Sequence, residues 1–455
     1  MFRNILDTYA YSDDYEFILN AGNNNFLNVF IQGGRLFYGV LNKILYTYFD
    51  SIELVKFIRL GSFFGGILLL FSLYKLFRYY GIETIYSLGI ILLFAASPSF
   101  NIIIIWSLAY QISWALLLTL LAGFIIAEYP SKWAISLSII IGVIALNLYQ
   151  PAYTMFIIPI FIKWLRDKNH HALLKPLLVH LTTYIIYFIT FKFYLSGFEL
   201  LPLDRGGIDY NIWNSLVTFI NDPFEQVLRY NLIFAAKFWL YVSKVFVFVL
   251  ILLVYLNKDD LYLKNLKQNK ILYFLIIPCF FILSMLPNIV SIDKWASFRT
   301  MNVLSLLVVI HIVFAIRKLV ESNKYALQKY VIPALVLGAL ISANYNVNHG
   351  FIDIQKKELK VMSSLVRQVN DSTERILVVP PEMEILKQNN YVKRVVTDEF
   401  GRLSNSSAWV PKPFINLLVK ENLNREIEVE FYNGQKLREN DLLFDIGKEY
   451  LRQND

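Results

Sequence analysis

Long apolar stretches recur along the first 346 residues of the chain and then stop. A helix needs roughly 20 mostly apolar residues to cross a bilayer, and fewer where surrounding protein shortens the path. The pattern therefore predicts a polytopic α-helical membrane region with about ten transmembrane helices, several of them short or broken by proline. The ten segments are 57–77, 85–96, 108–127, 133–148, 152–165, 177–195, 234–256, 271–290, 301–316 and 331–344.

The pattern after residue 346 is that of a soluble α+β domain. Residues 353–369 repeat apolar positions at the helical period, and RILVVPP (375–381) is typical of a strand that ends at prolines. The stretch EIEVEFYNGQKL (426–437) alternates around Asn433-Gly434, a pair that favours a type I′ turn, and so predicts a hairpin. We divide the chain into an N-terminal segment (1–53), a transmembrane region (54–346) and a C-terminal domain (347–455).

The composition is that of a membrane protein. Apolar residues make up 56% of the chain and charged residues only 17%, whereas soluble domains carry about 25% charged residues. The formal net charge of +8 is compatible with nucleic acid, anionic lipid or membrane topology as its cause. The single cysteine, Cys279, excludes a disulfide framework and a thiolate metal site.

The placement of Lys and Arg decides between these causes. Basic residues concentrate in every second loop, and the positive-inside rule makes those loops cytoplasmic. They are Lys75, Arg78, Lys132, Lys163, Arg166, Lys168, Lys175, Lys258, Lys264, Lys267, Lys270, Arg317, Lys318, Lys324 and Lys329. The opposing loops hold only Arg205, Arg229, Lys294 and Arg299. We therefore predict an extracytoplasmic N-terminal segment and C-terminal domain, with no nucleic-acid partner.

The N-terminal segment does not look like the start of a membrane protein. MFRNILDTYAYSDD is too short and too polar for a start-transfer signal, and residues 36–49 are typical of a helix lying in the membrane interface. We expect either unaided translocation of this segment or an upstream helix missing from the reading frame, and we favour the upstream helix.

Asp13 and Asp14, among aromatic residues on the predicted outer side, are the leading candidates for chemistry. A carboxylate near a membrane surface can accept a proton from a sugar hydroxyl as a general base. Arg35, which follows in the same segment, can hold a phosphate leaving group by bidentate hydrogen bonds. The alternative is that the aspartates cap a surface helix and Arg35 contacts lipid headgroups.

Four short motifs resemble one known family. YSDDYEF is followed by Gly-Gly-Arg35 and a short amphipathic helix, NLYQPAY carries Tyr149-Gln150, and WASFRTMN carries Arg299 before a late helix. In this order, and over most of the chain, they resemble the bacterial O-antigen glucosyltransferase family (glucosyltransferase family II), multi-spanning enzymes of the GT-C type. The family's first helix is the part with no counterpart here.

The resemblance implies an enzyme that moves a hexose, glucose in that family, from a polyprenyl-phosphate donor to a cell-surface glycan. Transfer would take place at the outer face of the bacterial cytoplasmic membrane, as in O-antigen or lipopolysaccharide modification. Asp13 or Asp14 would be the base, and Arg35 and Arg299 would bind the donor phosphate. A single base suits an inverting displacement. No nucleotide-binding motif is present, which agrees with a lipid-linked donor.

Other residues allow two interpretations each. Tyr149 and Gln150 could meet a sugar, or Gln150 could satisfy carbonyls freed by Pro151. Arg299 could reach to headgroups. The polar loop 398–409, with Glu399 and Arg402, could bind the acceptor or be an ordinary surface turn. The histidines lack metal-site spacing, so we predict no metal site and no cofactor, while a divalent cation at Asp13 and Asp14 stays open.

Two rival functions share the hydrophobic pattern. A polysaccharide repeat-unit polymerase would use the same outer-face chemistry. A lipid-linked sugar transporter or flippase would instead be expected to show repeated halves and ionisable groups near the membrane centre. We see no internal repeat, and the notable charges gather at the predicted outer face.

Overall fold

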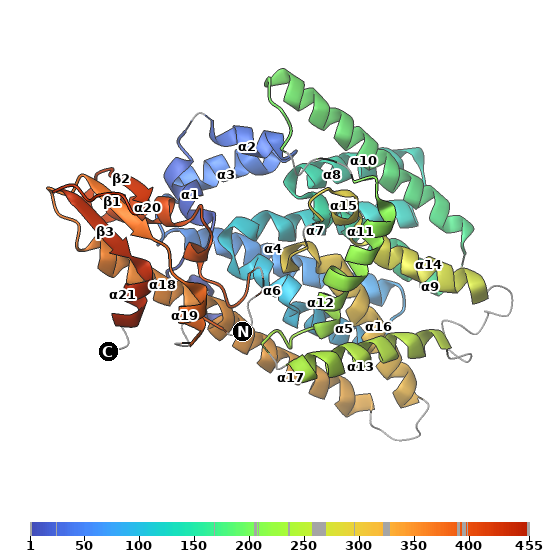
Figure 1. The fold of residues 1–455 in the computed structure, drawn as a ribbon. Helices are drawn as coiled ribbons and strands as arrows, with labels where there is room; N and C mark the ends of the chain where they lie inside the picture. The colour runs from blue at the N-terminus through green and yellow to red at the C-terminus, as the bar shows by residue number, and fades with distance from the viewer. Residues whose placement is uncertain are drawn as a thin grey trace.

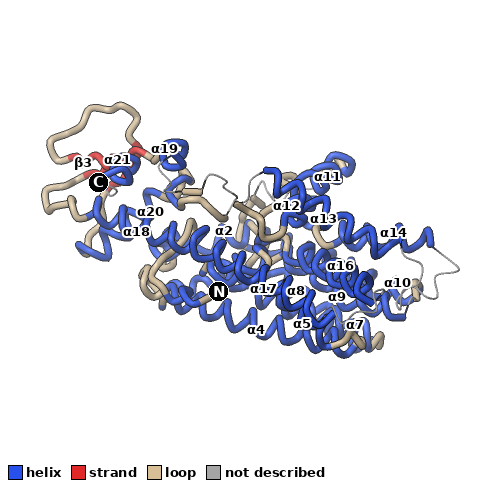
Figure 2. Tube along the Cα trace, turned by 90° about the horizontal axis from the view of Figure 1, so that it is seen from below, coloured by secondary structure: helices blue, strands red, loops and turns tan. Residues whose placement is uncertain are grey.

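The computed structural model describes residues 2–452 apart from 24, 168, 204–206, 208, 235–236, 257–269, 295, 322–327, 389–391, 394–396 and 398. Of the residues named above, Lys168, Arg205, Lys258, Lys264, Lys267, Lys324 and part of the 398–409 loop lie outside this description. Figure 1 shows an elongated helical body with three short strands gathered at one end, near the C-terminus. Figure 2 shows the same separation from below, with the strands away from the long helices.

The N-terminal segment forms one 3-10 turn and three short helices. They are η1 (Arg3–Leu6), α1 (Asp14–Asn20), α2 (Phe26–Gln32) and α3 (Leu36–Tyr48). The helix α3 agrees with the interfacial helix predicted at 36–49, and it is too short to cross a bilayer.

Five helices of the described chain are long and apolar enough to cross a membrane, and a bent pair would make a sixth. The five are α4 (Val55–Tyr79), η2 with α7 (Ser107–Glu128), α10 (His171–Gly197), α16 (Asn302–Glu321) and a helix over Tyr330–Val366. The last joins α17 (Gln328–Val347), η7 (Asn348–Ile352) and α18 (Asp353–Val366). The bent pair is α5 (Thr84–Ala96) and α6 (Pro98–Ile105), which meet at 59°.

The prediction of about ten spans is therefore wrong. Three other apolar segments form shorter or interrupted helices, because Pro151 opens a 3-10 turn and a break precedes Pro287. They form α8 (Lys132–Leu148), η3 (Gln150–Phe156), α9 (Ile157–Asp167), α14 (Lys270–Leu283) and α15 (Leu286–Val290). The helix α13 (Lys237–Leu256) has 20 residues, of which the described apolar stretch is Tyr241–Leu250. Between α10 and α13 lie α11 (Ile212–Phe219), η5 (Ile220–Phe224) and α12 (Glu225–Arg229).

The C-terminal domain contains a parallel sheet instead of the predicted hairpin. The strands β1 (Arg375–Val379), β2 (Glu428–Phe431) and β3 (Asp441–Asp445) lie in the order β2-β1-β3, and both outer strands run parallel to β1. The apolar β1 is buried on both faces and takes a partner at each edge, so β2 and β3 cannot pair with each other. Arg375 joins them through ion pairs to Glu430 (3.1 Å) and Asp441 (2.6 Å).

Helices complete this domain and confirm two sequence predictions. The helix predicted at 353–369 is α18, and the strand predicted in RILVVPP is β1. The remaining elements are α19 (Met383–Gln388), η8 (Ser404–Ser406), α20 (Pro411–Leu423) and α21 (Ile446–Arg452).

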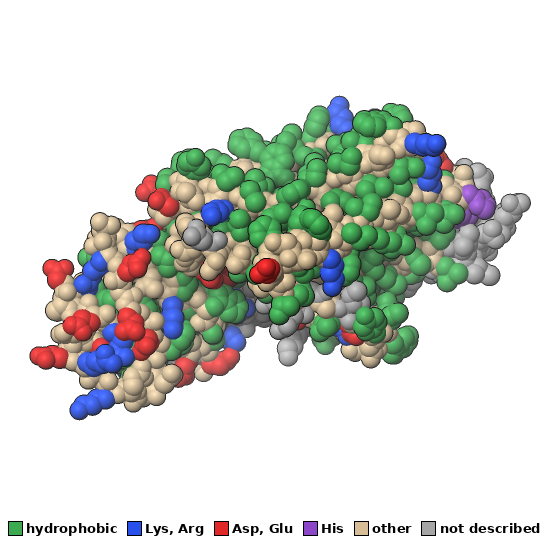
Figure 3. Space-filling view, turned by 90° about the horizontal axis from the view of Figure 1, so that it is seen from above, with side chains coloured by type: hydrophobic (Ala, Val, Ile, Leu, Met, Phe, Trp, Pro, Cys, Tyr) green, Lys and Arg blue, Asp and Glu red, His purple; other side chains and the backbone are tan. Residues whose placement is uncertain are grey.

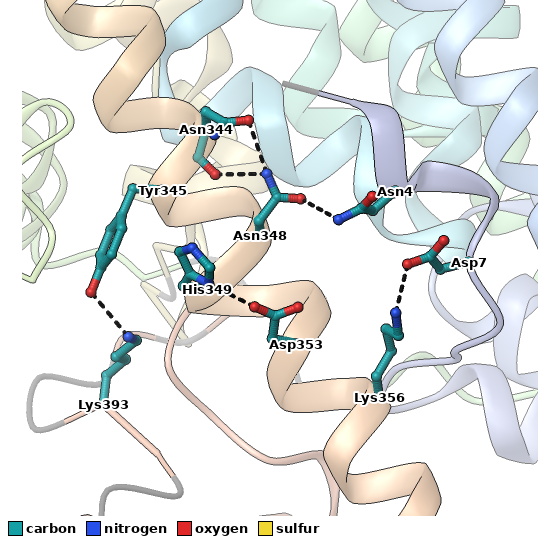
Figure 4. Close-up of polar contacts among 9 residues, drawn as sticks. All are labelled: Asn4, Asp7, Asn344, Tyr345, Asn348, His349, Asp353, Lys356 and Lys393. Carbon is teal, nitrogen blue, oxygen red and sulfur yellow. Dashed lines mark hydrogen bonds and ion pairs between the residues drawn. The ribbon is translucent and has the colours of Figure 1, made fainter.

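The C-terminal domain packs directly on the N-terminal segment. Figure 4 shows Asn4 and Asp7 pointing towards Asn348 and Lys356 of the Tyr330–Val366 helix, with hydrogen bonds of 3.0 and 2.8 Å. The rings of Tyr15 in α1 and Phe414 in α20 stack with centroids 3.8 Å apart. The two ends of the chain thus meet on one side of the helical body.

Contacts also join the loops predicted to be cytoplasmic. Arg317 at the end of α16 pairs with Glu83 at the start of α5 (3.0 Å), and Lys163 of α9 pairs with Glu128 at the end of α7 (3.1 Å). On the face seen in Figure 3, acidic and basic side chains are dense over the C-terminal domain, whereas the long body is mostly apolar. The charged domain and these loops lie at different ends of the molecule.

A buried arginine ties the N-terminal segment to the bundle. Arg59 of α4 is fully buried, and its guanidinium donates to the carbonyl oxygens of Ile5 (2.8 Å), Tyr9 (2.7 Å) and Asp7 (2.5 Å). It also lies 3.8 Å from the centroid of the Tyr9 ring. A charge inside a membrane protein is tolerated when backbone carbonyls and an aromatic face replace its hydration.

We predict that Arg59→Met lowers stability strongly. Methionine fills similar space but leaves three carbonyls without their donor, and each such loss costs about 1–3 kcal/mol. The melting temperature of the detergent-solubilised protein should fall well below that of wild type. The matched control is Lys56→Met, which removes a surface pair with Glu53 from the same helix and should change little. Equal melting temperatures for the two variants would contradict the assignment.

Candidate functional site

The carboxylate of Asp14 is fully buried and hydrogen-bonded to three parts of the chain. It accepts from the hydroxyl of Tyr46 in α3 (2.7 Å), the hydroxyl of Ser107 in η2 (2.6 Å) and the backbone N–H of Tyr11 (3.0 Å). Burial raises the pKa of Asp14 to about 6, against the opposing effect of these hydrogen bonds and of Arg59. Asp14 is therefore enclosed, and its oxygens already have partners.

Asp13 is the more accessible aspartate. It is half-buried at the N-cap position of α1, yet its side chain caps no helical N–H. Its Oδ1 instead accepts from the indole N–H of Trp409 (2.9 Å) and from the hydroxyl of Ser12 (3.2 Å). Asp13 can therefore meet an incoming group at the junction of the N-terminal segment and the C-terminal domain.

Arg35 and the Tyr149-Gln150 pair come together as one cluster. The Nε of Arg35 donates to Oε1 of Gln150 (2.8 Å), and the guanidinium lies 5.2 Å from the Tyr149 ring centroid. Gln150 in turn donates to the carbonyl of Gly33 (2.8 Å). The side-chain amide of Gln150 thus orients Arg35. It does not donate to the carbonyls near Pro151, which is the alternative interpretation of Gln150.

Gly34 explains the Gly-Gly-Arg motif. Its backbone has φ +70°, and a Cβ there would lie 2.2 Å from the hydroxyl of Tyr187 and 3.2 Å from Nε2 of Gln150. Its carbonyl accepts from Tyr187 (2.8 Å). Only glycine allows both the turn and this close approach of α10 to the loop that carries Arg35.

Arg299 lies beside Trp106, in a turn held by the C-terminal domain. Its guanidinium is 4.5 Å from the Trp106 ring centroid. The buried carboxylate of Glu399 accepts from the backbone N–H groups of Phe298 (3.3 Å) and Arg299 (3.4 Å). Glu399, predicted to bind a sugar, therefore fixes the turn η6 (Phe298–Thr300) that presents Arg299.

Arg402 also organises the loop that contains it. Its guanidinium donates to the hydroxyls of Ser406 (2.9 Å) and Ser407 (3.1 Å). Glu358 of α18 accepts from the backbone N–H groups of Ser404 (2.9 Å) and Asn405 (2.8 Å). Arg402 and Glu358 thus both hold the described part of the loop, which places Trp409 against Asp13.

Tyr38 lies where the N-terminal segment meets the Ser107–Glu128 helix, and burial raises the pKa of its phenol. Residues 106–108 contact Arg299, Asp14 and Tyr38 in turn, so Arg299 lies beside the N-terminal segment that carries Asp13 and Arg35. The hydroxyl of Tyr38 is bound to the carbonyl of Leu108 (2.7 Å), so the phenol is fixed at this junction.

Tyr38 and Trp106 are functional-site candidates that the sequence alone did not single out, whereas Trp409 belongs to the loop 398–409, for which acceptor binding was one of the two interpretations. In a chain with 16% aromatic residues, no count or spacing distinguishes them from interface aromatics. Within the described residues, no group of three or more His, Cys, Asp or Glu side chains could hold a metal ion. The open suggestion of a cation at both aspartates meets a difficulty, because the oxygens of Asp14 face hydroxyl and N–H donors.

No protein-family model matches this chain, and no curated protein matches it.

We predict that Asp14 makes stability depend on pH. With a folded pKa of about 6 against an ordinary value of 3.8, the folded protein takes up a proton between pH 8 and pH 5 that the unfolded chain does not. The ionised form costs stability above pH 6, and this cost disappears as the pH falls. The wild-type protein should therefore gain about 1 kcal/mol relative to Asp14→Asn between pH 8 and pH 5. Melting curves at both pH values test this, and a constant difference would refute it.

Proposed function

We propose that this protein is a membrane glycosyltransferase of the outer face of the bacterial cytoplasmic membrane. It moves a hexose from a polyprenyl-phosphate donor to a cell-surface glycan. The observation that carries the proposal is that residues 106–108 contact Arg299, Asp14 and Tyr38 in turn, which brings Arg299 beside the N-terminal segment that carries Asp13 and Arg35. A half-buried carboxylate and two guanidinium groups are the parts needed to deprotonate a hydroxyl and to hold a phosphate leaving group.

The two arginines are suited to the donor phosphate. Gln150 accepts a hydrogen bond from the Nε of Arg35, and the terminal nitrogens of the Arg35 guanidinium can then bind an anion. Arg299 is placed by the hydrogen bond of its backbone N–H to Glu399, and its guanidinium lies over the Trp106 ring. Guanidinium groups bind phosphate oxygens bidentately and keep their charge at every relevant pH.

Asp13 is the proposed general base, and Asp14 is a positioning residue. The acceptor hydroxyl gives its proton to Asp13 as its oxygen attacks the anomeric carbon of the donor sugar. The bond from that carbon to the phosphate oxygen breaks, and polyprenyl phosphate leaves with the electron pair, stabilised by Arg35 and Arg299. One displacement of this kind inverts the anomeric configuration. Asp14 sets the angle at which α1 presents Asp13.

We predict that Asp13→Asn lowers kcat by about 100-fold or more, since a positioned general base contributes roughly that much. The amide has the same shape and still accepts from Trp409, so folding should be preserved. Asp14→Asn should act mainly on stability. The assay is transfer of labelled hexose from a polyprenyl-phosphate hexose in membranes, with Asp7→Asn as the control for an acidic residue in the same segment.

The same assay separates the rival functions. Addition of single residues without a change in glycan chain length indicates a transferase, whereas loss of long chains in Asp13→Asn cells indicates a polymerase. Wild-type turnover by Asp13→Asn would refute the proposed base. Loss of activity at every pH in Asp14→Asn, together with wild-type turnover by Asp13→Asn, would assign the base to Asp14 instead.

We further predict that Arg35→Gln and Arg299→Gln raise the KM for the donor. A charged hydrogen bond is worth about 1.5–3 kcal/mol, so each change should weaken donor binding by roughly ten-fold or more. Arg229→Gln is the matched control, because Arg229 is paired with Glu225 in α12. Unchanged donor KM in both variants would show that the phosphate binds elsewhere.

A further inference from the structure

The environment of Trp409 is unusual for a tryptophan of this protein. Its side chain is 56% exposed, although the loop beneath it is held by Arg402 and Glu358. The other exposed tryptophans among the described residues, Trp133, Trp213 and Trp239, stand on helices of the largely apolar body, where lipid contact accounts for them. Trp409 belongs to the C-terminal domain, whose surface is rich in charged side chains (Figure 3).

The orientation of Trp409 is fixed by the very residue proposed as the base. Its indole N–H donates to Oδ1 of Asp13 (2.9 Å), so the polar edge of the ring is occupied. The second anchor is the hydrogen bond from the backbone N–H of Ser12 to the hydroxyl of Ser404 (3.0 Å). Stacking of Tyr15 on Phe414 holds the start of α20 in place. A large flat apolar face is thereby kept exposed next to a carboxylate.

We propose that Trp409 is the platform on which the acceptor sugar stacks, so that the C-terminal domain forms the acceptor subsite. This inference rests on the proposed function and names the residue that determines acceptor binding. A pyranose has an apolar face of C–H groups and a polar edge of hydroxyls. The ring face of Trp409 packs against the apolar C–H face of the sugar. Asp13 accepts a hydrogen bond from a hydroxyl at the polar edge of the sugar. The rigid aromatic ring does this at a low cost in conformational entropy.

Kinetics separate the ring face from the indole N–H. Trp409→Ala removes the ring face and the indole N–H. It should raise the KM for the acceptor by roughly ten-fold, which corresponds to a loss of about 1.4 kcal/mol of binding free energy. The donor KM should stay at the wild-type value. Trp409→Phe keeps an aromatic face and should retain most acceptor affinity, while kcat falls because Asp13 loses its hydrogen-bond donor. An unchanged acceptor KM in Trp409→Ala, or an equal rise in donor KM, would overturn the proposal.

A binding measurement tests the platform without relying on transfer. Methyl glycosides of glucose, galactose, rhamnose and N-acetylglucosamine are added at millimolar concentration to the full-length protein in a detergent without a sugar headgroup. Saturation-transfer NMR should detect at least one glycoside with wild type, with Trp409→Phe and with the control Trp213→Ala, but not with Trp409→Ala. No glycoside bound by wild type, or equal signals in Trp409→Ala, would overturn the platform. If wild type binds a glycoside but shows no transfer, the proposed function fails and the saccharide site stands.

Discussion

The hydrogen-bonded, buried carboxylate of Asp14 is the interaction on which the arrangement of the candidate site depends. It joins α3 through Tyr46, the start of the Ser107–Glu128 helix through Ser107, and its own segment through Tyr11. Because Asp13, Asp14 and Tyr15 are consecutive at the start of a helix, fixing the middle residue directs its neighbours. Asp13 then meets Trp409, and Tyr15 stacks on Phe414.

A buried charge of this kind is costly, and the fold compensates for it locally. Desolvation is the largest influence on Asp14, and three hydrogen bonds together with the charge of Arg59 act against it. Arg59 in turn is satisfied by carbonyls of the N-terminal segment that precede Asp14. The two buried charges therefore depend on the same segment, so a change in either should loosen the attachment of α1 to both the bundle and the C-terminal domain.

The sequence was most informative where a residue has one physical role. Arg35 and Gln150 were each named from a short motif, but their hydrogen bond, which Gly34 permits, was not predicted. The number of spans could not be predicted, because short apolar helices buried in protein have the same composition as spanning ones. The prediction of a hairpin was wrong because β2 and β3 each pair with β1, which lies some 50 residues earlier in the chain than β2. The contact of Glu399 with the η6 turn could not be predicted, because sequence does not reveal which backbone N–H groups a carboxylate meets.

The contacts of Arg35 and Asp13 give the donor and the acceptor of the proposed function separate routes to one base. Arg35 lies against α10 through Gln150 and Tyr187, and the outer surface of α10 is apolar, with Phe188, Ile189 and Phe193 exposed. Asp13 lies against the C-terminal domain through Trp409. On the proposed function, the polyprenyl chain would remain in the membrane beside α10 while its phosphate meets Arg35. The acceptor would arrive along the charged domain, and Glu399 would link the two approaches by holding Arg299 to the loop that carries Trp409.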